Sequence, residues 1–174
     1  MRATKKLAIS AMVVALSAVL LMIGAFVSVA DLLMGAIASL LVVFVFIEIR
    51  SPYTWLVWLA TTLTVFFMPS GMTVGALYFL VFGLYPILKA YIERTPRILW
   101  WIIKLIYVNA VIVILLLASG FILGVPFFES ELWYINAALW LLMNVAFVAY
   151  DMFITVMVRL YMIKYRKIFR KFLR

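Results

Sequence analysis

Six long apolar segments joined by short polar connections make up most of this 174-residue sequence. We place the segments at residues 7–29, 32–49, 53–68, 74–91, 98–123 and 132–159. Each has roughly 16–28 residues, the length that lets a helix cross a hydrocarbon core of about 30 Å. Apolar residues make up 70% of the chain and charged residues 12%, which is more apolar surface than a soluble domain of this length can bury. The sequence therefore predicts an all-α integral membrane protein, with six transmembrane helices in one compact bundle that forms a single domain.

The positions of the charged residues predict the orientation of these helices. All 15 lysines and arginines lie near the two termini or around the second and fourth connections. The other three connections, at residues 28–31, 69–72 and 124–131, contain no cation, and the first and last of them hold Asp31, Glu129 and Glu131. Because short loops rich in lysine and arginine stay in the cytoplasm, we expect both termini to be cytoplasmic.

The basic tail at residues 160–174 alternates cations with large apolar residues. We expect it to contact anionic lipids of the inner leaflet, as an amphipathic helix would. The alternative is a solvated flank that only fixes the orientation of the last helix. The net charge of +9 is explained by the cations on the expected cytoplasmic side, so we expect no nucleic-acid partner.

The residue types present exclude several kinds of chemistry. The chain has no cysteine and no histidine, which removes disulfides, thiol chemistry and the commonest metal ligand. It also lacks the motifs of metalloproteases, serine hydrolases and nucleotide-binding loops. We therefore expect no enzymatic activity, no metal site and no cofactor.

The sixth segment carries polar residues on one face. At about 100° per residue, Asn136, Trp140, Asn144, Phe147 and Asp151 fall within roughly 80° of arc, and such a face should point away from lipid. Its outer part predicts a substrate pocket that a flat ring would enter by stacking on Trp140. The residues expected to contact substrate are Asn136, Trp140, Asn144, Tyr78 of the fourth segment and Glu129 of the last outer loop. The alternative is that the amides, with Asn109 of the fifth segment, join helices by hydrogen bonds while Trp140 packs.

Asp151 lies deeper along the same segment, toward the cytoplasmic side. Lys104, Lys89 and Glu48 lie at a similar depth, and we expect the four to form an ionic cluster. A carboxylate within the membrane needs a partner, so Asp151 is expected to pair with Lys104 or with Lys89. The alternative role for Asp151 is a step in a proton relay.

Small residues recur on the first segment. Ala8, Ala11, Ala15 and Ala18 follow one another at helical spacing and predict a face that another helix can approach closely. That helix belongs either to a partner protein or to this chain.

The opening KKLAISAMVVALSAVLL, in a six-segment chain with both termini inside, resembles the substrate-binding S component of energy-coupling factor (ECF) transporters. The segments FGLYPILKAYIER and WWIIKLIYVNA are similar to an S-component-like branch of unknown substrate. The resemblance implies a prokaryotic cytoplasmic membrane protein that captures a vitamin-like small molecule from outside. It also implies that Ala11 and Ala15 dock on a transmembrane coupling subunit, which works with two cytoplasmic ATPases. No histidine-rich amino terminus is present, which argues against nickel or cobalt as substrate.

Two other functions fit the same composition. The chain is alternatively a structural or scaffold membrane protein of the cell envelope, with no substrate and a filled interior. A small secondary carrier is the third possibility. It would need internal inverted symmetry or an ion site, and the sequence indicates neither.

Overall fold

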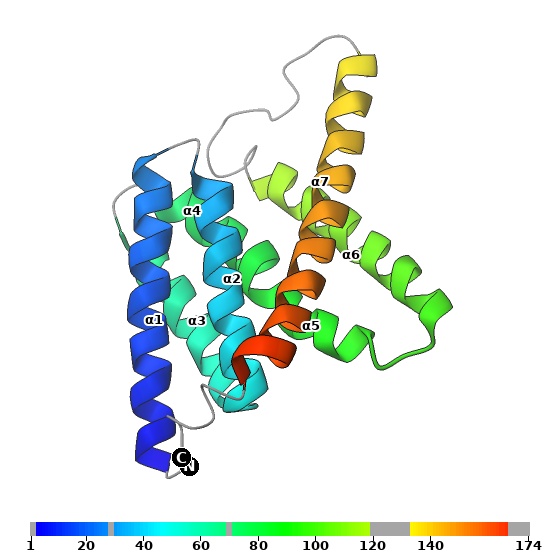
Figure 1. The fold of residues 1–174 in the computed structure, drawn as a ribbon. Coiled ribbons are helices and arrows are strands. Elements are labelled where there is room, and N and C mark those ends of the chain that lie inside the picture. Colours follow the sequence, from blue (N-terminus) through cyan, green and yellow to red (C-terminus); the bar gives the residue numbers. More distant parts are fainter. Residues whose placement is uncertain (1–2, 28–29, 69–70, 119–132, 167–174) are drawn as a thin grey trace. The chain divides into compact units, whose positions relative to one another are not determined.

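The computed structural model describes residues 3–27, 30–68, 71–118 and 133–166, and most of the described residues lie in helices (Figure 1). Each of the six expected segments corresponds to helical structure. The elements are α1 (Ala3–Phe26), α2 (Asp31–Glu48), α3 (Tyr53–Phe66), α4 (Gly71–Leu77), η1 (Tyr78–Gly83), α5 (Leu84–Ile92), α6 (Arg97–Ala118), α7 (Trp133–Leu160) and η3 (Tyr161–Tyr165). The expected fourth segment is the continuous run α4–η1–α5, in which η1 is a π-helix.

Five of these helical segments are long and apolar enough to cross a membrane. The exception is α3, whose 14 residues span about 21 Å at 1.5 Å per residue. The first helix begins at Ala3 rather than at residue 7, because a helix continues through polar residues after hydrophobicity has ended. Large apolar side chains lie exposed on the helices, including Met12 at 72% and Leu141 at 66%. Such surfaces suit lipid as the surrounding solvent.

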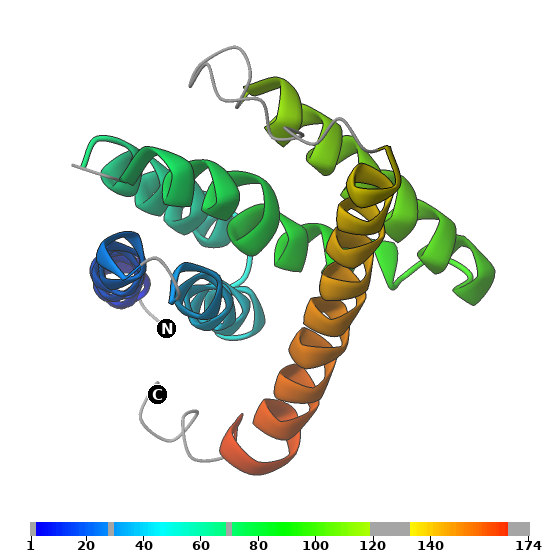
Figure 2. The same ribbon diagram turned by 90° about the horizontal axis from the view of Figure 1, so that it is seen from above.

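The contacts divide the chain into two compact units. Unit 1 comprises Met1–Tyr91 with Ile154–Arg174, and unit 2 comprises Ile92–Phe153. In unit 1, α1 lies beside α2, and Figure 2 looks along both. The third helix α3 also packs against α1.

The contact between α1 and α3 has a matched pattern of buried positions. The chain runs along α1, back along α2 and forward again along α3, so α1 and α3 are parallel (Figure 1). Val13 and Val57 belong to one buried apolar cluster, from which we infer that these two residues lie at a similar level. On each helix, the residues three positions before, four positions after and eight positions after the valine are also buried. The pairs are Ser10 with Thr54, Ser17 with Thr61, and Leu21 with Val65. A spacing of three and four residues is the period at which one helix face meets another.

The π-helix η1 is stabilised from α3 by one tryptophan. A π-helix changes the ordinary backbone hydrogen bonding of a helix, and the indole Nε1 of Trp58 donates to the carbonyl oxygen of Phe79 at 3.1 Å. The Trp58 ring also stacks on the Phe79 ring, with centroids 4.9 Å apart. Gly83 permits this approach, since a Cβ there would lie 2.5 Å from Trp58 Cδ1.

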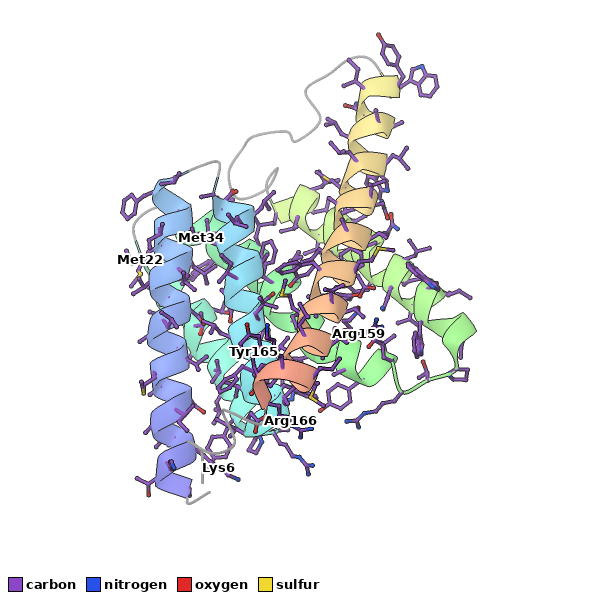
Figure 3. All side chains as sticks on the ribbon, in the orientation of Figure 1. Lys6, Met22, Met34, Arg159, Tyr165 and Arg166 are labelled. Carbon is purple, nitrogen blue, oxygen red and sulfur yellow. The ribbon has the colours of Figure 1, made fainter. Side chains whose placement is uncertain are left out.

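The end of α7 and η3 contact α2 within unit 1. The Tyr161 hydroxyl donates to Glu48 Oε1 at 3.2 Å, and Arg166 Nε lies 3.5 Å from the same oxygen. The Tyr161 ring meets Phe44 edge to face. Figure 3 labels Lys6 and Arg166 at the same end of this unit, the end at which α1 begins. Residues 167–174 of the expected basic tail lie outside the described residues, and its first residues continue the helix of α7.

Gly71, at the start of α4, is predicted to tolerate no side chain. A methyl group at Gly71 would overlap the carbonyl oxygen of Val65, a backbone atom that cannot rotate away. We expect Gly71→Ala to lower the free energy of unfolding by about 1–3 kcal/mol, measured by denaturant titration in detergent micelles. Gly75→Ala is the control, because its Cβ would meet the Phe66 backbone at 3.4 Å, an ordinary contact. Equal stability of the two variants would contradict the prediction.

Candidate functional site

The polar face of α7 lies against α6 in unit 2. The two helices run antiparallel, as three contacts show: Lys104 with Asp151, Tyr107 with Phe147, and Asn109 with Asn144. Residues later in α6 contact residues earlier in α7. The predicted face of the sixth segment is therefore the face that contacts α6, and long side chains make the contacts.

An amide network joins the two helices at their middle. Trp140 Nε1 donates to Asn109 Oδ1 at 2.8 Å, and Asn109 Nδ2 donates to Asn144 Oδ1 at 3.2 Å. One further hydrogen of each amide bonds back to its own helix, Asn109 Nδ2 to the carbonyl of Leu105 and Asn144 Nδ2 to the carbonyl of Trp140. Asn109 thus bridges α6 and α7. The polar atoms of Trp140 and Asn144, expected to face a substrate, are bonded within the protein.

A buried ion cluster lies further along the same contact. Lys104 Nζ is 3.0 Å from Asp151 Oδ1 and 2.9 Å from Oδ2, and it is 3.1 Å from Glu93 Oε1. The side chains of Lys104 and Asp151 are only 6% and 7% exposed. The rings of Trp100 and Trp101 flank the ammonium, with centroids 6.0 and 5.8 Å away. The three ammonium hydrogens have three carboxylate oxygens within reach, which makes this a satisfied clamp.

Two other members of the expected ionic cluster belong to unit 1. Glu48 is bonded to Tyr161 and lies near Arg166, as described above. Lys89 is buried in α5 at 4% exposure. Of the two partners considered for Asp151, the structure places Lys104 in contact with it. Glu93 was not foreseen as a member, because it lies in a connection rather than in an apolar segment.

The remaining substrate candidates are placed as follows. Tyr78 opens η1 in unit 1 and is fully buried, with its hydroxyl beside that of Thr61. Asn136 lies half-buried near the start of α7. Glu129 lies outside the described residues. The substrate role of these residues stays a prediction.

Ala11 and Ala15, the predicted docking residues, are exposed on α1, as is Ala8. The fourth alanine of the expected face, Ala18, is buried at 6% exposure. The small-residue strip therefore lies on the outer surface of α1 over its first half and turns inward at Ala18.

The arrangement is suited to holding helices together. Over the described ranges, no three His, Cys, Asp or Glu side chains gather to hold a metal ion. An apolar cavity of about 310 Å³ is present in unit 1 between α2 and the end of α7, with Phe44, Ile47 and Met157 among its lining residues. No protein-family model, curated protein or solved structure matches this chain.

The Lys104–Asp151 pair is expected to show strong coupling. Lys104→Met leaves the buried carboxylate of Asp151 and the partly exposed carboxylate of Glu93 without the Lys104 cation, and it should cost about 3–5 kcal/mol of unfolding free energy. Asp151→Leu should cost a similar amount, because it removes the better buried of the two carboxylates. The double variant should lose less than either single variant. Denaturant unfolding of all four proteins gives the coupling, and additive losses would contradict a paired clamp.

Asn109 is expected to contribute more to the stability of the protein than its size suggests. Asn109→Leu removes the acceptor of Trp140 and the donor to Asn144, so it should destabilise the protein by about 1–3 kcal/mol. Trp140→Phe removes the indole donor and part of the ring volume, and it should cost less because Asn109 keeps its bond to Asn144. If the network is real, combining the two substitutions adds little to the loss from Asn109→Leu alone. The measurement is the same unfolding titration.

Proposed function

We propose that this chain is the membrane-embedded, substrate-binding subunit of an ECF-type importer. In this proposal it captures a small vitamin-like molecule from outside a prokaryotic cell and docks on a shared transmembrane coupling subunit. Two cytoplasmic ATPases supply the energy, and the chain itself catalyses no reaction. Both termini are cytoplasmic.

The observation that carries the proposal is the exposed alanine strip of α1. The opposite side of α1 holds α2 and α3, so the helix already has its intramolecular partners. Ala11 and Ala15 nevertheless remain exposed. In lipid, small residues on a helix surface favour association because two backbones approach closely there. An internal packing role would have covered these alanines.

Substrate capture is assigned, within this proposal, to the face of α7 and to Tyr78. Asn136 and Trp140 stand toward the start of α7, which the charge pattern puts on the outer side. Trp140 offers a ring for stacking, and Asn144 lies one turn further in. Glu129 is proposed to contact a polar group of the substrate from the outer loop.

A scaffold protein without a substrate is the second candidate, and the amide network favours it. Asn109, Trp140 and Asn144 satisfy one another, as residues of a filled helix contact do. A transporter subunit requires space beside these residues. The two candidates therefore differ in whether a small molecule co-purifies.

The alanine strip gives the direct test. The double variant Ala11→Leu with Ala15→Leu should lose the coupling subunit and ATPases on affinity purification from native membranes in mild detergent. The wild-type chain should retain them. Ala60→Leu is the matched control, since Ala60 is an exposed alanine of α3 away from the strip. Failure of the wild type to recover any such partner would overturn the transporter proposal.

A further inference from the structure

Five buried hydroxyl groups of unit 1 have no hydrogen-bond partner among the described residues. We call them the hydroxyl row: Ser10, Ser17, Thr54, Thr61 and Tyr78. Each is at most 6% exposed, and four of them are fully buried. The Tyr78 and Thr61 hydroxyls lie beside each other without the geometry of a standard hydrogen bond. A buried hydroxyl without a partner costs free energy, so five in one unit need a physical account.

The hydroxyl row is organised in two levels. The register of α1 and α3 puts Ser10 level with Thr54, and Ser17 level with Thr61. Tyr78 joins the second level through its neighbour Thr61. Val13 and Val57 form an apolar layer between the two levels. The first level therefore offers two hydroxyls and the second offers three.

Other buried hydroxyls in the same unit use a different solution. Ser39 Oγ donates to the carbonyl of Ala36 at 2.6 Å, and Thr62 Oγ1 donates to the carbonyl of Trp58 at 2.8 Å. Bonding back to one's own helix is the ordinary way to hide a hydroxyl in an apolar helix. The serines and threonines of the hydroxyl row do not take it, although they are equally buried. Their oxygens are left for a partner between the helices.

We propose that the hydroxyl row binds ordered water between α1 and α3, one site at each level. Water needs two to four polar partners in a buried site, and the two levels supply two and three hydroxyls. A hydroxyl both donates and accepts, so it can satisfy either end of a bridging water. The surrounding residues Val13, Val57, Leu21 and Val65 are apolar, which favours a neutral occupant over an ion. This inference concerns unit 1 alone and stands apart from the transport proposal.

The absence of cysteine from the sequence allows a direct test. Ser10, Ser17, Thr54 and Thr61 are replaced one at a time by cysteine, which puts a single thiol at each place. The proteins, in lipid nanodiscs, are transferred to D2O, and the infrared S–H stretching band reports whether each thiol exchanges its hydrogen with water. The thiols of the hydroxyl row should exchange, whereas Ser39→Cys should keep its S–H band, because Ser39 is as buried but lies outside the row. S–H bands that persist in all four variants, and disappear only after denaturation, would overturn the proposal.

The sign of a stability change gives a second, independent test. Thr61→Val keeps the shape of the side chain and removes its hydroxyl. If the hydroxyl holds water, the folded-to-unfolded ratio should fall about tenfold in a denaturant titration. If the hydroxyl is dry, its removal relieves an unsatisfied polar group and the ratio should rise, which would contradict bound water. Thr54→Val tests the other level in the same way.

Discussion

Lipid offers no hydrogen bonds, so a polar side chain inside this protein must find its partner within the protein or in bound water. That constraint accounts for where the polar residues of both units lie. Lys104 is held between Asp151 and Glu93, and Asn109 is held between Trp140 and Asn144. Glu48 is met by Tyr161 at the end of α7. In each case a polar side chain bonds to a residue of another part of the chain, because an unpaired polar group in an apolar surrounding costs free energy. Polar pairs thus fix which helix faces meet, while apolar residues mainly decide that the segments are helices.

The helices were predictable because hydrophobicity and length suffice to identify a segment that suits a membrane. The six segments lie at the expected places, and α3 is the short one, as the 16 residues available to it suggested. The π-helix η1 was not foreseen. Its hydrogen bond from Trp58 to the Phe79 carbonyl and its close approach at Gly83 depend on tertiary contact between α3 and η1. No local pattern encodes such a contact. The division into two compact units was likewise absent from the sequence pattern, because both units share the same apolar composition.

The candidate site was predictable in part, for a related reason. The helical period alone puts Trp140, Asn144, Phe147 and Asp151 on one face, and those residues contact α6. The similar depth of the two residues suggested Lys104, besides Lys89, as a partner of Asp151. Glu93 was missed because a connection gives no periodicity. The hydroxyl row was missed because serine and threonine interrupt hydrophobicity too little to be noticed. The pattern was nevertheless present: a serine or threonine stands three residues before, and another four residues after, Val13 and Val57.

The closed amide network limits how a substrate can use α7. Breaking the bond from Trp140 to Asn109 leaves a part-buried donor and a part-buried acceptor, which costs at most about 1–3 kcal/mol for each group unless the ligand replaces both. A ligand that stacks on the ring of Trp140 breaks nothing, because the ring face takes no part in the network. Stacking therefore lets substrate binding and helix joining coexist in one residue. A ligand that recognised the amides would instead have to part α6 from α7. The network thus favours a flat, largely apolar ligand over one that hydrogen-bonds to Asn109 or Asn144.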